Sequence, residues 1–188
     1  MCSEIQAALL GILGTLMGTI LGWVLNNFSQ HGKLNIFIST WKDNFEYNKS
    51  GYLTQSSSIE QTEYYSYELS IDIYNSSAET KIMRNIEIVF MNKKEELYCS
   101  IPYDKSTRRA GAGAIVYKDI VPINIPPKSV IHIDLTKGIN NSDESFKNIW
   151  DTTHVFFKYI NDKNAKKKIL IKKEKYCDYF VNKSVDMV

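Results

Sequence analysis

The chain has 188 residues, and its 23 basic and 21 acidic side chains leave a formal charge of +2. This near balance, with only three arginines, argues against a dedicated nucleic-acid-binding protein. The three cysteines, Cys2, Cys99 and Cys177, include no CxxC pair, which excludes the usual zinc-finger pattern and is typical of a reducing compartment. The abundance of Lys, Asn, Ile and Tyr is typical of an AT-rich bacterial genome.

The N-terminal segment is long and apolar enough to cross a bilayer. No charged residue lies between Glu4 and His31. A helix of ~20 such residues spans the ~30 Å hydrocarbon core of a membrane. The sequence therefore predicts a short tail and a single transmembrane helix (about residues 5–27) within a first region, 1–31, and a β domain over residues 32–188.

Four glycines lie on one face of this predicted helix. At ~100° per residue, Gly11, Gly14, Gly18 and Gly22 fall within about 80° of one another. Lipid tails are as apolar as leucine, so helices in a bilayer associate by close packing along small residues. We therefore predict that this face mediates helix–helix packing and that the protein is a homo-oligomer.

A cleaved signal peptide is the alternative interpretation of this segment. Signal peptides begin with basic residues, and their apolar run of ~7–15 residues ends at a small-x-small cleavage site. Here Glu4 is the only charged residue before the helix and Asn26–Phe28 follow the apolar run, so an uncleaved anchor is favoured. The lysines that follow, Lys33 and Lys42, favour a cytoplasmic β domain.

The rest of the chain alternates between short β-type runs and turns. The clearest strand covers residues 62–74, where apolar and polar side chains alternate. Further strands are predicted at 33–41, 83–91, 96–101 (with Leu97, Cys99 and Ile101 inward), 115–125, 130–135, 155–160 and 168–173. Loops are predicted at 43–61 and 104–114, a helical turn at 145–150, and an aromatic C-terminal segment, 176–188, that docks on the domain or frays. With no long amphipathic helix, this pattern predicts an antiparallel β-sandwich.

The order of these elements resembles that of bacterial immunoglobulin-like and fibronectin-like domains. An alternating strand leads into the turn sequence YNSS, followed by a strand ending at Phe90, a hairpin, and the sequence INIPPKSVIHIDL. The resemblance covers residues 65–135 and implies an immunoglobulin-like or fibronectin-like sandwich, but it implies no particular function.

The sequence contains no recognisable catalytic or cofactor-binding pattern. His132 and Asp134 lie on the same face of a predicted strand, which indicates a solvent-facing hydrogen-bonded pair without a third ligand for a metal ion. No G-x-S-x-G motif is present to position a nucleophilic serine. We therefore expect no metal, no cofactor and no enzymatic activity.

One candidate contact site is the Arg–Gly segment in the predicted loop. Arg108 and Arg109 precede Gly111 and Gly113, and guanidinium groups beside exposed backbone N–H groups suit an anionic ligand or partner. The strand–loop–helix context of a phosphate-binding loop is missing, so an ordinary flexible loop is the structural alternative.

A second candidate site is the lysine-rich C-terminal strand. Anionic lipid attracts lysines near the cytoplasmic membrane surface, and an acidic partner does so equally. The candidates are Lys166, Lys167, Lys168, Lys172 and Lys173. Lysines on an edge strand also prevent sheet-to-sheet aggregation, which is the structural alternative.

Together these features predict a single-pass protein of the cell membrane whose β-sandwich binds a partner or ligand. The expected partners are membrane lipid, a second copy of the chain and another protein, with no nucleic acid. A first alternative is a membrane-acting effector, of the toxin or phage-defence type, that perturbs the bilayer on oligomerisation. A second alternative is an exported cell-surface binding module, in which Cys99 and Cys177 would be free to pair.

Overall fold

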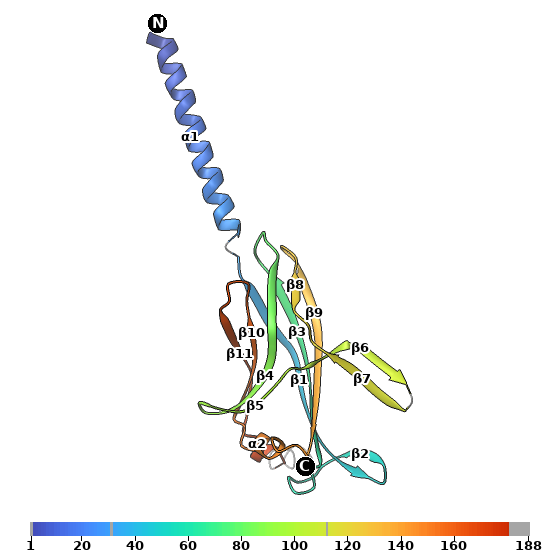
Figure 1. Cartoon of the computed structure of the whole chain (residues 1–188). Helices are drawn as coiled ribbons and strands as arrows, with labels where there is room; N and C mark the ends of the chain where they lie inside the picture. Colours follow the sequence, from blue (N-terminus) through green and yellow to red (C-terminus); the bar gives the residue numbers. More distant parts are fainter. Residues whose placement is uncertain (1, 31, 112, 181–188) are drawn as a thin grey trace, which may run out of the picture.

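A long N-terminal helix extends from a two-layered β domain (Figure 1). The computed structural model describes residues 2–30, 32–111 and 113–180, and their side chains except those of Cys2, Ser29 and Gln30. The docking predicted for residues 176–188 is therefore described only as far as residue 180, and residues 181–188 lie outside the described part.

The described residues form two α-helices, eleven strands and a 3-10 turn, in the following order. These are α1 (Cys2–Gln30), β1 (Leu34–Lys49), β2 (Tyr52–Gln55), β3 (Tyr64–Asn75), β4 (Lys81–Asn92), β5 (Glu95–Ser100), β6 (Tyr103–Gly111), β7 (Ala114–Asp119), β8 (Ile123–Ile125), β9 (Val130–Asn140), α2 (Phe146–Ile149), β10 (His154–Ile160), β11 (Lys166–Lys173) and η1 (Tyr176–Asp178).

Every strand pair among these elements is antiparallel. One sheet has the order β2-β1-β3-β9-β6-β7, and the other has the order β11-β10-β4-β5 with β8 also paired to β4. The two sheets face each other across a shared core, which confirms the predicted antiparallel sandwich.

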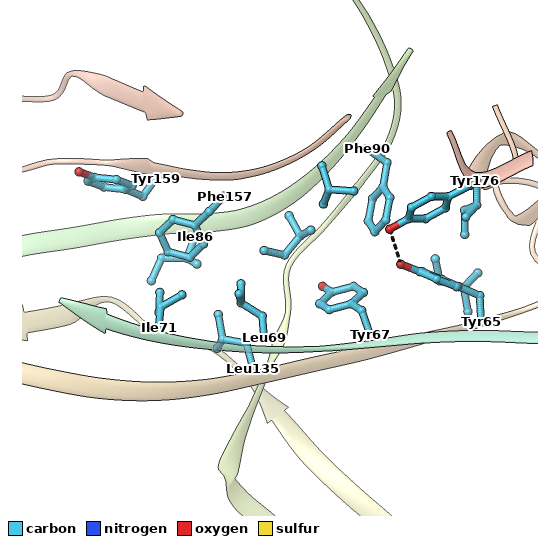
Figure 2. Close-up of a cluster of buried hydrophobic side chains, with 14 of the residues drawn as sticks. Tyr65, Tyr67, Leu69, Ile71, Ile86, Phe90, Leu135, Phe157, Tyr159 and Tyr176 are labelled. Carbon is cyan, nitrogen blue, oxygen red and sulfur yellow. Dashed lines mark hydrogen bonds between the residues drawn. The ribbon is translucent and has the colours of Figure 1, made fainter. Parts of the chain in front are cut away.

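Strand β3 supplies the clearest inward face. Its apolar side chains Tyr65, Tyr67, Leu69 and Ile71 are fully buried, while the residues between them are only half-buried. Figure 2 shows them pointing across the sandwich toward the opposite sheet, where Ile86, Phe90 and Phe157 meet them. Each fully buried large apolar side chain contributes ~1.5–3 kcal/mol, so this alternation holds the two sheets together.

The predicted loop over residues 43–61 is wrong in its first half, because β1 continues to Lys49. A bulge between Ile38 and Thr40 inserts one extra residue into the strand. Before the bulge Ile36 and Ile38 face the core, and after it Trp41, Asp43 and Phe45 do so. A shift of one residue exchanges the side chains that face the core with those that face solvent. The second half of β1, whose sequence is mostly polar, therefore also has every second side chain in the core. Within the same predicted loop, residues 52–55 form β2 and pair with the end of β1.

The predicted inward set on β5 is also wrong. Cys99 and Ile101 are exposed, while Ser100 is buried and Tyr98 packs against the core. Tyr98 and Ser100 pair with Phe90 and Ile88, whose side chains are buried in the core, and therefore share their inward face. Leu97 is an extra residue on β5, between the Phe90–Tyr98 and Met91–Glu96 pairs, and this bulge takes it out of the alternation.

The predicted loop over residues 104–114 is largely a hairpin of β6 and β7, and it extends away from the sandwich (Figure 1). The strand predicted over 115–125 is divided into β7 and β8, which belong to different sheets. Pro122 lies between the two strands, where the lack of a backbone N–H does not remove a hydrogen bond between strands. The helical turn predicted over 145–150 is confirmed by α2.

Candidate functional site

Helix α1 has an uncovered apolar surface. Its segment Ser3–Phe28 is apolar over 26 residues, long enough to cross a membrane, and none of its most apolar window is buried against the rest of the chain. Among the described residues, no atom lies within 4 Å of a Cβ placed at Gly11, Gly14, Gly18 or Gly22. The predicted glycine face is therefore not covered by the β domain. A membrane anchor and a signal sequence both satisfy this description by length and composition.

The connection from α1 to the sandwich is built into the fold. The N–H of Lys33 donates to Ser76 Oγ at 2.9 Å, and the Ser76 hydroxyl and N–H both donate to the carbonyl of Lys33, at 2.9 and 3.1 Å. Gly32 packs so closely that a Cβ there would overlap the backbone of Ser77. The chain is therefore fixed to the β3–β4 turn from residue 32 onward.

The predicted lysines of β11 do not form one surface. Lys166 and Lys167 lie at the end of β11 that begins the strand, and Lys167 lines a cavity beside Gly32 and Leu34 at the helix junction. The Nζ of Lys168 lies 3.5 Å from Glu96 on β5. Antiparallel pairing with β10 carries Lys172 and Lys173 to the opposite end of the sandwich, beside His154 and Val155.

Lys172 belongs to a buried polar cluster around Asp43, a residue that the sequence analysis placed in a loop. The Asp43 side chain is 2% exposed, and its Oδ2 lies 2.6 Å from the Nζ of Lys172 and accepts the Trp41 indole N–H at 2.9 Å. Its Oδ1 accepts the hydroxyls of Tyr65 and Tyr176, at 2.7 and 2.8 Å. Four donors thus satisfy one buried carboxylate, which is the condition for keeping a charge inside a protein.

Burial and neighbouring charges shift the pKa values of the tyrosines and the lysine in this cluster. Burial, together with the neighbouring Asp43 carboxylate, raises the pKa of Tyr65 and Tyr176 well above the usual tyrosine value. Burial opposes the charge of Lys172, but Asp43 and Glu174 favour it, and the net pKa of Lys172 is raised. At neutral pH Lys172 is therefore charged and both phenols are neutral. It fastens the C-terminal segment rather than poising a group for chemistry.

The Arg–Gly segment lies on the β6–β7 hairpin, which we call the arm (residues 103–119). Arg108 and Arg109 are exposed and, with Ser106, Thr107 and Lys118, line a hollow of about 230 Å³. Gly113 has a φ of +78°, which residues with a side chain rarely adopt, so glycine at this position allows the turn of the hairpin. Gly111 pairs with Ala114 at the end of the ladder. The arm thus presents two arginines to solvent and remains a predicted contact site.

The predicted His132–Asp134 pair lies on the outer face of the larger sheet. His132 Nε2 is 3.4 Å from Asp134, and Nδ1 is 2.7 Å from Asp72, which also accepts the Ser39 hydroxyl at 2.6 Å. The hydrogen bond that the His132 ring donates to the Asp72 carboxylate raises the pKa of His132. His132 and Asp134 thus face solvent side by side, but the short hydrogen bond of the ring is made with Asp72, which the prediction did not include. Within the described part of the chain no group of three His, Cys, Asp or Glu residues is placed to hold a metal ion.

Cys99 and Cys177, the two cysteines whose side chains are described, are free and exposed. Partial burial and the neighbouring Glu87 raise the pKa of Cys99 to about 11. Because the thiolate is the reactive form, the Cys99 thiol is a poor nucleophile at neutral pH.

Comparison with known proteins places the β domain in a family. The profile of the YopI Ig-like domain family matches residues 32–172. A curated relative, the SPbeta prophage-derived uncharacterized protein YopI of Bacillus subtilis strain 168, is 27% identical over 143 residues, which cover 74% of this chain and 81% of the relative.

The solved structures that match this chain are remote from it. An uncharacterized beta-sandwich protein from Clostridium difficile 630 is 14% identical, with a TM-score of 0.34 over 74% of this chain and 86% of that one. A protein from Archaeoglobus fulgidus is 10% identical, with a TM-score of 0.35 over 72% of this chain and 98% of that one. The family profile, which begins directly after α1 and covers the sandwich as far as β11, shows that the chain belongs to the YopI Ig-like domain family.

Proposed function

We propose that this protein is a single-pass membrane-anchored binding module, in which α1 anchors and self-associates and the Ig-like domain recruits a partner. The observation that carries the proposal is the 26-residue apolar helix with no covering contact from the sandwich. In water, such a surface would be a large exposed apolar patch, which soluble monomers rarely tolerate. In a bilayer the same apolar side chains contact lipid tails instead of water.

The junction supports an uncleaved anchor over a removed signal sequence. Proteases cut segments that are exposed and free to extend. Here Gly32 and Lys33 are packed and hydrogen-bonded to the β3–β4 turn directly after the helix. Cleavage beyond Gly32 would remove part of this attachment, and the attachment begins within two residues of the end of α1, which supports a chain that stays joined to the helix.

The glycine face supports self-association. Gly14, Gly18 and Gly22 are spaced four residues apart, and their uncovered surface allows a second helix to approach closely. Since the sandwich of the same chain does not reach this face, a helix from another copy is the partner that fits it.

The hydroxyls on α1 argue against the bilayer-perturbing alternative. Thr15 donates to the carbonyls of Gly11 and Ile12, at 3.0 and 2.9 Å, and Thr19 donates to Thr15 at 2.8 Å. These hydroxyls are engaged within the helix, so α1 offers no polar stripe to line a water-filled pore.

Alkaline carbonate extraction of membranes from cells producing the full chain tests the anchor. We expect the protein to stay in the membrane pellet with its N-terminal residues present by mass spectrometry. Recovery in the carbonate supernatant, or a mature chain that begins after α1, would refute the proposal.

A membrane-impermeant maleimide distinguishes a cytoplasmic sandwich from an exported one. Because Cys99 reacts slowly at neutral pH, the experiment uses Ala110→Cys on the exposed arm, in a chain whose Cys2 and Cys177 are replaced by serine. We expect labelling only after lysis, as the lysines following the helix indicate. Labelling of intact cells would support the exported binding module instead.

A further inference from the structure

A basic cavity lies where the helix meets the sandwich. Its volume is about 390 Å³, and Lys33, Lys81, Lys163 and Lys167 line it together with a single carboxylate, Asp162. These residues come from the helix junction, the start of β4, and the β10–β11 turn with the strand that follows it. Figure 1 shows this turn at the end of the sandwich nearest α1. The fold therefore gathers lysines from three distant parts of the chain at one end of the domain.

The cavity has an excess of positive charge that the protein itself does not neutralise. Lys81 has a side chain only 7% exposed, and its Nζ lies 3.0 Å from Asp162 and 3.9 Å from Glu79. This buried lysine is therefore compensated and fixed in place. Within the described residues, no ion pair joins Lys33, Lys163 or Lys167 to a carboxylate. Three ammonium groups thus remain available around a pre-formed hollow.

The position of the cavity indicates what kind of anion it meets. Lys33 follows the last residue of α1 by three positions, which is at most about 10 Å of chain. The attraction of anionic lipid for lysine acts within about one Debye length, or ~8–10 Å. With α1 across the bilayer, the cavity therefore opens in the layer occupied by lipid phosphates.

We propose that this junction cavity binds the phosphate of an anionic membrane lipid, with Lys33, Lys163 and Lys167 as its contacts. The inference rests on the proposed membrane anchoring. Leu34 and Tyr159, which also line the cavity, provide a less polar wall for the glycerol part of a lipid. The bound lipid holds the sandwich against the membrane in one orientation, which α1 alone, as a single attachment point, does not do.

The full chain, purified in neutral detergent and depleted of lipid, is titrated with phosphatidylglycerol or phosphatidylcholine, and bound lipid is measured by native mass spectrometry. We expect a defined complex with phosphatidylglycerol and at least about tenfold weaker retention of phosphatidylcholine. Lys163→Gln with Lys167→Gln is expected to weaken phosphatidylglycerol binding by roughly tenfold or more. The matched control, Lys173→Gln with Lys175→Gln, removes the same charge at the far end of the sandwich and is expected to leave binding unchanged.

Three results would overturn the inference. The first is equal retention of both lipids, and the second is an equal loss of phosphatidylglycerol binding in both double variants. The third is displacement of phosphatidylglycerol by millimolar inorganic phosphate that itself stays bound, which would indicate a site for free phosphate. Carbonate extraction of the same variants separates the two proposals. A chain that stays in the membrane but shows no lipid preference refutes only the cavity, whereas a chain that washes off refutes the anchor.

Discussion

The carboxylate of Asp43 lies 2.6 Å from the ammonium group of Lys172, which joins the first strand of the sandwich to the last. The two residues are 129 positions apart in the chain. Tyr65 and Tyr176 hydrogen-bond the same carboxylate, and Tyr179 donates to the Asp43 carbonyl at 3.3 Å. This cluster closes the end of the sandwich that lies away from α1.

Removing the carboxylate is expected to destabilise the domain strongly. Asp43→Ala leaves Lys172 with Glu174 as its remaining partner and removes the acceptor of the Tyr65 and Tyr176 hydroxyls. Each buried donor left unsatisfied costs ~1–3 kcal/mol. Thermal unfolding of the full chain in detergent, followed by near-UV circular dichroism, measures the change. Asp119→Asn, at an exposed residue 3.6 Å from Lys137, is the control and is expected to change stability by less than ~0.5 kcal/mol. Adding Lys172→Met to Asp43→Ala should recover part of the loss, and strict additivity of the two changes would contradict the coupling.

Alkaline pH is expected to unfold the domain through its buried tyrosines. Tyr65, Tyr67 and Tyr176 have raised pKa values, chiefly because burial disfavours the phenolate. The folded state therefore holds these protons more tightly than the unfolded state. Their contribution to stability is complete below the unfolded pKa of ~10 and is lost as pH rises above it toward the folded values. Phenolate absorbance and near-UV circular dichroism, recorded together, should show the buried tyrosines ionising only as the fold is lost. Their ionisation near pH ~10 in an intact fold would contradict the buried cluster.

His132 is expected to titrate above the ordinary histidine value of 6.5, because its ring hydrogen-bonds Asp72. Since the folded pKa is raised, the interaction stabilises the fold below the unfolded pKa and is lost as pH rises through the folded value. Asp72→Asn should lower the pKa measured by NMR titration of the ring. Asp134→Asn should lower it less, because Asp134 lies 3.4 Å from the ring rather than 2.7 Å. An equal effect of the two changes would argue against the Asp72 hydrogen bond.

Bulky side chains on the glycine face of α1 are expected to abolish self-association. Gly14→Leu with Gly18→Leu would hold the backbones of two helices apart along the proposed contact. Crosslinking in native membranes, resolved by size, measures the oligomer. Leu16→Phe adds bulk on the opposite side of the helix and should leave the crosslinked species unchanged. Equal crosslinking in the glycine variant and the native chain would show that another surface mediates any assembly.

The sequence predicted well where a local pattern was sufficient. The unbroken apolar run gave α1, and the strict alternation from Tyr65 to Ile73 gave the inward face of β3. It failed where the pairing of a strand with its neighbour decided which side chains face the core. The bulge after Ile38 brings Asp43 inward, and on β5 the pairing of Tyr98 and Ser100 with the inward-facing Phe90 and Ile88 leaves Cys99 on the outer face. A bulge depends on how a strand pairs with its neighbour, so the residues of that strand do not reveal it.

The candidate sites likewise differ in whether a local sequence pattern is enough to predict them. The glycine face needs only the helical repeat, and it was predicted from the positions of Gly11, Gly14, Gly18 and Gly22. The junction cavity needs closure of the whole fold, because Lys33, Lys81 and Lys163 meet only after the strands between them have paired. In the sequence, each of these lysines has the character of an ordinary surface residue.

By itself, then, the sequence determined the apolar helix, its glycine face and an antiparallel sandwich, because periodicity and hydrophobicity act over a few neighbouring residues. The tertiary structure alone decided that Asp43 is buried against Lys172, that the arm is a projecting hairpin, and that one end of the domain has a basic hollow. Those features depend on strand register and long-range pairing, whose free energy comes from contacts between residues far apart in the chain.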